Sequence, residues 1–192
     1  MIDMRTVVLV EGASDEAAIL ALAERQGRDL AAEGVSIVAM GGATNIGAHL
    51  DEYGPHGLGV RLAGLCDARE EAHFARGLER VGLGSGLTRG DLEALGFFVC
   101  VADLEDELIR ALGTDAVEHV LDAAGELGAF RTLQKQPAWR GRPVHAQLRR
   151  FMGSIGGRKL RYSRLFAQAL GPDQVPRPLH LLLAHLSATR TG

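Results

Sequence analysis

Residues 5–15 read R-T-V-V-L-V-E-G-A-S-D, and this stretch decides the fold. A β-branched apolar run stops at Glu11, and Ser14 then offers a helix N-cap to a stretch with helical apolar spacing. The segment therefore predicts a strand at 5–10, a tight turn and a helix at 14–26. Because the strand ends directly in a carboxylate, Glu11 is the first candidate for a functional side chain.

The same alternation continues along the first part of the chain. Further apolar runs, helical patterns and a glycine-rich loop predict strands at 35–40, 60–66 and 97–102, helices at 44–53 and 70–80, and a loop at 82–90. This alternation predicts an α/β fold of Rossmann-like type, with a mostly parallel four-stranded sheet flanked by helices. Ligands of such sheets bind beyond the carboxyl ends of the strands.

Beyond residue 103 the pattern is helical. The apolar spacing predicts helices at 104–113, 115–127, 143–152, 160–170 and 178–188. We therefore predict a core at 1–113 and a C-terminal helical extension at 114–192. A chain of 192 residues that is 46% hydrophobic is long enough for one well-buried core.

The charges are unevenly distributed. Residues 1–126 hold 23 of the 24 acids, whereas residues 127–172 contain no acid and ten Arg or Lys side chains. This basic segment, 131–164, is either a solvated face or a surface that contacts the phosphates of a nucleic acid.

Targeting signals are not evident. Cys66 and Cys100 lie inside apolar runs, where we expect buried thiols in a reducing compartment. The sequence has no secretory leader pattern and no long apolar span, so we expect a cytoplasmic protein without membrane contact.

Three of the four predicted strands end in acidic residues. Glu11 follows the first strand, Asp67 the third, and Asp103 with Glu105 the fourth. Carboxylates gathered at one edge of a sheet repel one another unless a cation is present. Mg²⁺ prefers such oxygen ligands, whereas zinc would want His or Cys, and the seven histidines are scattered.

Some of these acids have a second interpretation. Asp15 lies in the first turn of a predicted helix, where the helix dipole alone favours a negative charge. Asp103 and Glu105 could serve the next helix in the same way, and Glu70 is similarly ambiguous.

The motifs E-G-A-S-D at 11–15 and A-D-L-E-D-E-L at 102–108 resemble the Toprim domain, most of all that of the overcoming-lysogenization-defect nucleases. The resemblance covers about residues 5–110. It implies DNA cleavage by two-metal hydrolysis with Mg²⁺, or Mn²⁺ in its place, and a catalytic role for Glu11. The metal ligands that it implies are Glu11, Asp15, Asp67, Asp103 and Glu105.

A basic motif adds to this resemblance. G-G-R-K-L-R-Y at 156–162 looks like the segment of these nucleases that carries a lysine near the scissile phosphate, which makes Lys159 a candidate for transition-state charge stabilisation. A helix-entry loop on a solvated face is the alternative. The candidate nucleic-acid contacts are Arg149, Arg150, Arg158, Lys159 and Arg161.

Two departures from the family pattern keep other functions open. Toprim proteins usually end the third strand with Asp-x-Asp, but here Arg69 takes the second position. Either Glu70 or Glu71 would replace the missing acid, or Arg69 would fill the place of one metal and leave a one-metal or inactive site. The chain also lacks the nucleotide-binding pattern GxxxxGK[ST], so we expect either an ATPase partner on another chain or no ATPase at all.

The alternatives are a degenerate Toprim module that binds nucleic acid or a partner ATPase without cutting, and a phosphotransferase acting on small molecules. As a substrate we favour DNA over RNA. A homodimer is left open.

Overall fold

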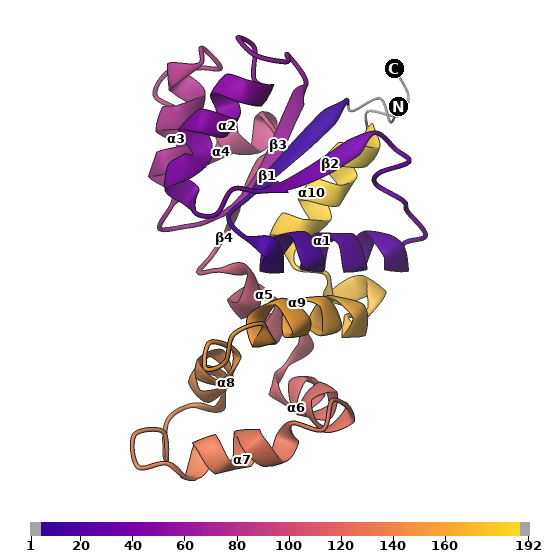
Figure 1. Ribbon diagram of the computed structural model, residues 1–192, viewed down its shortest axis with the longest axis vertical. Coiled ribbons are helices and arrows are strands. Elements are labelled where there is room, and N and C mark those ends of the chain that lie inside the picture. The colour runs from indigo at the N-terminus through magenta and orange to yellow at the C-terminus, as the bar shows by residue number, and fades with distance from the viewer. Residues whose placement is uncertain (1–4, 189–192) are drawn as a thin grey trace.

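A parallel sheet forms the centre of the upper part of the molecule, with helices on both of its faces (Figure 1). The computed structural model describes residues 5–188. The strands follow the spatial order β2-β1-β3-β4, and every neighbouring pair is parallel. The predicted four-stranded α/β fold is confirmed, with strands β1 (Thr6–Val10), β2 (Val35–Ala39), β3 (Arg61–Asp67) and β4 (Phe97–Cys100).

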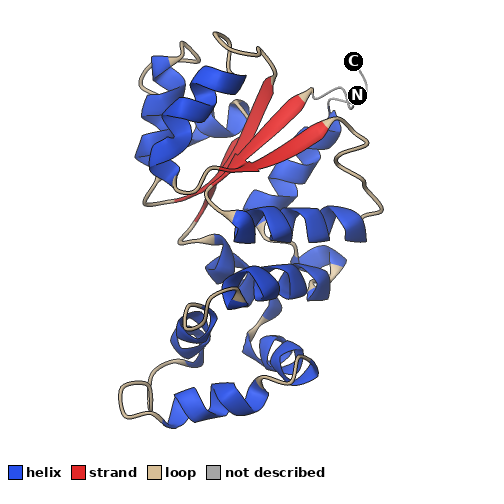
Figure 2. Ribbon diagram, viewed as in Figure 1, coloured by secondary structure: helices blue, strands red, loops and turns tan. Residues whose placement is uncertain are grey.

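Helices make up most of the remaining chain (Figure 2). Among residues 5–188, none is long and apolar enough to cross a membrane. The α-helices are α1 (Ala13–Arg25), α2 (Ile46–Tyr53), α3 (Glu71–Arg80), α4 (Arg89–Ala94), α5 (Leu104–Leu112), α6 (Thr114–Ala123), α7 (Leu127–Lys135), α8 (Val144–Met152), α9 (Arg158–Ala169) and α10 (Arg177–Ser187).

The sheet is covered by helices on both faces, and every residue of its central strand β1 is buried. Val8 and Val10 belong to the core that also contains residues of α1 and α10, whereas Val7 and Leu9 belong to the core under α2, α3 and α4. Side chains that alternate along a strand point to opposite faces, so a continuous apolar run fits a sheet covered on both sides. Cys66 and Cys100 are buried and unbridged, as predicted.

Three local expectations were wrong. The loop expected at 82–90 ends early, because Thr88 caps α4 by accepting a hydrogen bond from the backbone N–H of Asp91. Helix α7 was not predicted, and neither was α4. Ser14 is not an N-cap either, since α1 begins one residue earlier with Gly12 as its N-cap.

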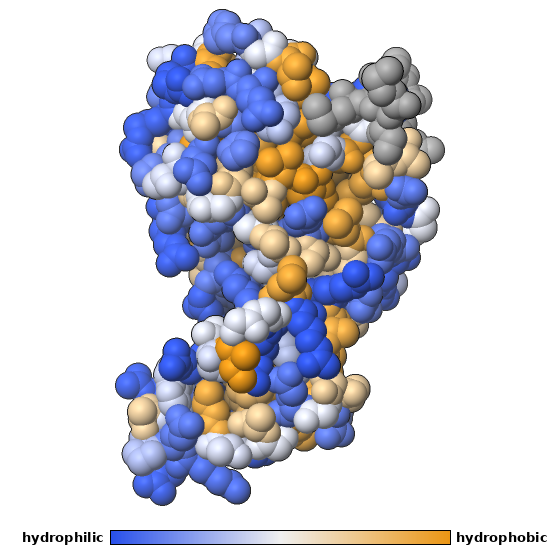
Figure 3. All heavy atoms as spheres, viewed as in Figure 1, coloured by the Kyte–Doolittle hydropathy of each residue, from blue (hydrophilic) through white to orange (hydrophobic). Residues whose placement is uncertain are grey.

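The C-terminal helices fall into two groups. Helix α9 packs along α1, whereas α10 packs on the sheet itself, against β3 and β4. Helices α6, α7 and α8 lie farther from the sheet, at the bottom of Figure 1. Hydrophobic side chains gather over the sheet in the upper half of Figure 3, while hydrophilic ones cover much of the rest. The division at residue 113 remains a prediction, and its outer bounds lie beyond the described residues.

Candidate metal centre at the carboxyl edge of the sheet

The carboxyl ends of the strands surround a hollow of about 230 Å³. β1 and β3 are neighbours at the centre of the sheet, and the chain leaves them toward opposite sides, which is where parallel sheets bind ligands. The hollow is lined by Glu11, Gly12, Ser14, Asp15, Gly41, Gly42, Asp67, Asp103, Glu105 and Lys159. We call the carboxylates of Glu11, Asp15, Asp67, Asp103 and Glu105 the acidic edge.

Two backbone turns shape one side of this hollow. The carboxylate of Asp15 turns back to accept a hydrogen bond of 2.9 Å from the N–H of Gly12, which satisfies a free donor at the start of α1. The N–H of Gly42 donates to the carbonyl of Glu11 at 3.1 Å. Gly42 has a φ of +128°, which a residue with a side chain rarely adopts, so the turn beside Glu11 needs a glycine.

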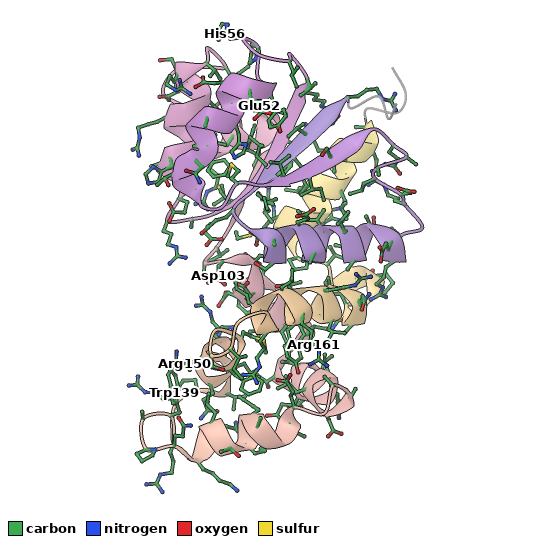
Figure 4. All side chains as sticks on the ribbon, in the orientation of Figure 1. Glu52, His56, Asp103, Trp139, Arg150 and Arg161 are labelled. Atoms are coloured by element: carbon green, nitrogen blue, oxygen red, sulfur yellow. The ribbon has the colours of Figure 1, made fainter. Side chains whose placement is uncertain are left out.

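The opposite side is built where α5 begins. Asp103, labelled in Figure 4, is the N-cap of α5, and its Oδ1 accepts the N–H of Asp106 at 2.9 Å. Its Oδ2 forms an ion pair with Arg149 of α8. Lys159, in the first turn of α9, places Nζ 3.0 Å from Oε1 of Glu105. Helices from the end of the chain thus bring two cations to carboxylates of the core.

Burial, together with the neighbouring negative charges, raises the pKa values of two acids at the edge. Burial raises the pKa of Asp67 to about 7, and the carboxylates of Glu11 and Asp103 add to the effect. Burial also raises the pKa of Asp15 to about 6, although the hydrogen bond from Gly12 opposes this. The positive charge of Lys159 therefore does not fully offset the negative charges of the acidic edge.

Lys159 and Glu105 influence each other. Burial raises the pKa of the Glu105 carboxyl, and the nearby ammonium of Lys159 partly offsets that rise. Burial alone would lower the pKa of Lys159, but the attraction of Glu105 outweighs it and the pKa is raised. Lys159 is therefore a cation at neutral pH.

These residues fit a hard divalent cation. The donors at the acidic edge are carboxylate oxygens, which Mg²⁺ and Mn²⁺ prefer. Burial and the neighbouring carboxylates raise the pKa of Asp67, and a bound cation would oppose both effects. Within residues 5–188, no three of the acidic, His or Cys side chains already stand in a ligating arrangement. Three of the carboxylates are instead engaged by Gly12, Arg149 and Lys159.

Glu70 lies outside this hollow. It is the N-cap residue of α3, and its carboxylate is 3.6 Å from Nε2 of His73 and 3.8 Å from Nε of Arg69. Arg69 is itself 71% exposed at its side chain and lies 3.4 Å from Oδ2 of Asp67. Glu70 is not among the residues that line the hollow, so its predicted role as a metal ligand gains no support from its position.

The predicted nucleic-acid contacts occupy different surroundings. Arg149 and Lys159 lie at the acidic edge, and Arg150 is exposed on α8. Arg158 is only 9% exposed, stacks on the ring of Phe151 at 3.9 Å and pairs with a glutamate. Arg161 pairs with the same glutamate, on a different side of the molecule from Asp103 in Figure 4.

The contact between Arg149 and Asp103 is the part of the site that sequence reasoning missed. It joins residues 46 positions apart and depends on how α8 packs near α5. No local motif carries that information.

Comparison with known protein families agrees with this geometry. Residues 4–68 match the overcoming lysogenization defect protein-like Toprim domain. This segment is thus similar to a Toprim domain of the overcoming-lysogenization-defect type. The match includes the E-G-A-S-D motif and ends just after Asp67, so it covers the β1 and β3 parts of the acidic edge. The expected resemblance is confirmed.

Solved structures share the fold over nearly the whole chain. The C-terminal region of the Burkholderia pseudomallei OLD protein superposes with a TM-score of 0.74 at 22% identity, covering 96% of this chain and 98% of that one. The C-terminal region of the Xanthomonas campestris pv. campestris OLD protein gives a TM-score of 0.73 at 25% identity, covering 96% and 92%. No curated protein matches the chain in sequence.

Proposed function

We propose that this protein is a Mg²⁺-dependent Toprim phosphodiesterase that cleaves DNA by metal-assisted hydrolysis. The observation that carries the proposal is the acidic edge, where five carboxylates from β1, α1, β3 and the start of α5 line one hollow together with Lys159. Toprim domains generally bind a divalent metal. DNA as the substrate is part of the proposal.

Each side chain has a role that follows from its position. Glu11, Asp67 and Asp103 would hold the ion, since they end three adjacent strands, and Asp15 and Glu105 would complete the set. The ion would supply a nucleophilic water and stabilise charge on the phosphate oxygens. Lys159 remains protonated beside Glu105 and can stabilise negative charge that develops on a phosphate at the mouth of the hollow.

A second candidate is a Toprim module that binds nucleic acid or a partner ATPase without cutting. The observation that favours it is Arg69, which stands where Toprim proteins usually have a second aspartate and points largely into solvent. A site with one carboxylate fewer would hold a single ion or none. An ATPase partner on another chain and a cytoplasmic setting belong to either proposal.

Cleavage assays distinguish the two candidates. We would incubate the protein with supercoiled plasmid and with labelled single strands, each in Mg²⁺, Mn²⁺ or EDTA, alongside Glu11→Gln. The nuclease proposal expects cleavage that needs a metal and is lost in Glu11→Gln while the circular dichroism spectrum stays unchanged. DNA binding that survives EDTA, without cleavage in any metal, would support the binding module instead.

A further inference from the structure

Arg149 occupies a carboxylate oxygen that a metal ion would use. Oδ1 of Asp103 accepts the N–H of Asp106 and thereby caps α5, so this oxygen serves the fold. Oδ2 is the oxygen left for a ligand, and the guanidinium of Arg149 binds it. The arginine and a metal ion therefore compete for one atom of Asp103.

The same arginine faces a second, smaller hollow. This space of about 170 Å³ is lined by Arg149, Met152 and Gly153 and shares Asp103, Glu105 and Lys159 with the first hollow. A water molecule takes roughly 30 Å³ of liquid volume, so the space suits a group of several heavy atoms. Its two cationic groups, Arg149 and Lys159, are balanced by the carboxylates of Asp103 and Glu105, so the space would favour an anion once those carboxylates hold a metal ion.

Metal binding would change the partners of Arg149. A divalent ion held by Oδ2 would bring a second positive charge to the oxygen that Arg149 already binds, and two cations so close together repel each other. The other acid near Arg149 is Asp106, 3.9 Å away. One carboxylate oxygen of Asp106 is already bound by Arg110 at 2.7 Å, and the other lies 3.2 Å from Nε2 of His145, so both oxygens have neighbours without Arg149.

We propose that Arg149 is a phosphate-binding residue that Asp103 holds until a divalent metal takes this carboxylate. The inference rests on the proposed function and adds the order in which the metal and the DNA bind. The metal releases the guanidinium, and the released guanidinium binds a phosphodiester oxygen in the smaller hollow. Arg149 thus opposes metal binding in the free protein and couples metal binding to DNA binding, a coupling that is reciprocal by thermodynamic necessity.

The first test measures metal affinity without any catalysis. Mn²⁺ would be titrated into the wild-type protein, Arg149→Gln and Arg150→Gln, with free Mn²⁺ followed by electron paramagnetic resonance. Because Arg149→Gln removes a competing cation, we expect it to bind Mn²⁺ about fivefold more tightly. Arg150→Gln removes the same charge from the next, exposed position, which lies apart from Asp103 in Figure 4, and should leave the Mn²⁺ affinity unchanged.

The second test measures DNA binding. The affinity for a labelled oligodeoxynucleotide would be compared in Ca²⁺ and in EDTA by fluorescence anisotropy. We expect Ca²⁺ to strengthen wild-type binding about tenfold and to strengthen Arg149→Gln binding about twofold at most. Arg149→Lys, which keeps the charge, should bind Mn²⁺ as the wild type does.

The outcomes distinguish a failure of the proposed function from a failure of the role inferred for Arg149. A wild-type protein that binds no Mn²⁺ overturns the proposed function and this inference together. A wild-type protein that binds Mn²⁺, with an Arg149→Gln variant that binds it no more tightly, overturns this inference alone. Tighter Mn²⁺ binding combined with a lost metal effect on DNA binding is the expected result, and a merely structural arginine would not produce it.

Discussion

Two acidic regions of this protein differ in how their charge is balanced. Glu126 lies between α6 and α7. Its Oε2 forms an ion pair with Nε of Arg158 at 2.8 Å, and its Oε1 forms one with Nη1 of Arg161 at 2.9 Å, so two arginines neutralise one carboxylate. At the acidic edge, five carboxylates share three cations, Lys159, Arg149 and the largely exposed Arg69. The first region is saturated with positive charge, whereas the second keeps a surplus of negative charge.

This difference in charge balance indicates which of the two regions binds a cation. Buried acids that serve only the fold are normally paired, because an uncompensated charge costs stability. Part of the basic segment does this work, as Arg131 does by binding Glu118 at 2.9 Å. The acidic edge is compensated only in part, which is the pattern expected where an external cation completes the site.

The largest effect is expected from removing charge at the acidic edge. Asp67→Asn should lower the rate of plasmid cleavage about 10²- to 10³-fold, because a ligand at the end of β3 is lost. Glu93→Gln is the matched control, since it removes a carboxylate that pairs with Arg177 at 2.6 Å on the surface. Equal rates in Asp67→Asn and wild type would break the comparison.

Adjacent residues 158 and 159 sharpen the comparison, because one belongs to each region. Arg158→Ala should lower the free energy of unfolding by about 3 kcal/mol, since a buried ion pair and a ring contact are lost. Lys159→Met should change it by only about 1 kcal/mol and should instead slow cleavage about 10²-fold. Urea unfolding and plasmid nicking give the two readouts, and a swap of the effects would refute the assignment.

Mg²⁺ should stabilise the folded protein by binding at the acidic edge and not at the paired acids elsewhere. At a concentration of Mg²⁺ 100 times the dissociation constant, we expect a gain of about 2.7 kcal/mol in the free energy of unfolding. The gain should disappear in Glu11→Gln and persist in Glu93→Gln. Thermal unfolding with Mg²⁺ or EDTA measures it, and an equal gain in all three proteins would place the bound ion elsewhere.

The smallest effect is a dependence of stability on pH in EDTA. The raised pKa of Asp67, about 7, means that the folded protein holds this proton more tightly than the unfolded chain does. Its contribution to stability is therefore present at low pH and is lost as the pH rises through about 7. We expect a loss of about 1 kcal/mol between pH 5 and 8 in wild type, and a smaller loss in Asp67→Asn, by urea unfolding.

The sheet and most of the acidic edge could be predicted from the sequence because they rest on local signals. Apolar runs that stop at a carboxylate gave the positions of Glu11, Asp67 and Asp103, and parallel strands then bring such ends together. The cap of α4 also had a local signal, since Thr88 and Asp91 have capping-box spacing inside a stretch rich in glycine. The spacing of Leu127, Phe130 and Leu133 likewise indicated α7, and both signals were overlooked.

What could not be predicted depends on contacts between distant parts of the chain. The ten basic residues of 127–172 suggested one phosphate-binding surface, but the fold turns Arg158 inward and pairs Arg161 with Glu126. Only the packing of α8 and α9 decides that Arg149 and Lys159 reach the acidic edge. Sequence spacing contains no record of these long-range pairings.

The central claim is that the acidic edge binds a divalent cation. Anomalous diffraction from crystals soaked in Mn²⁺ tests it most directly, because the signal locates the ion without relying on activity. We predict a Mn²⁺ peak in the hollow between Glu11, Asp67 and Asp103, and none in crystals of Glu11→Gln. Crystals of the wild-type protein with no peak in this hollow, or with Mn²⁺ bound only elsewhere, would contradict the account.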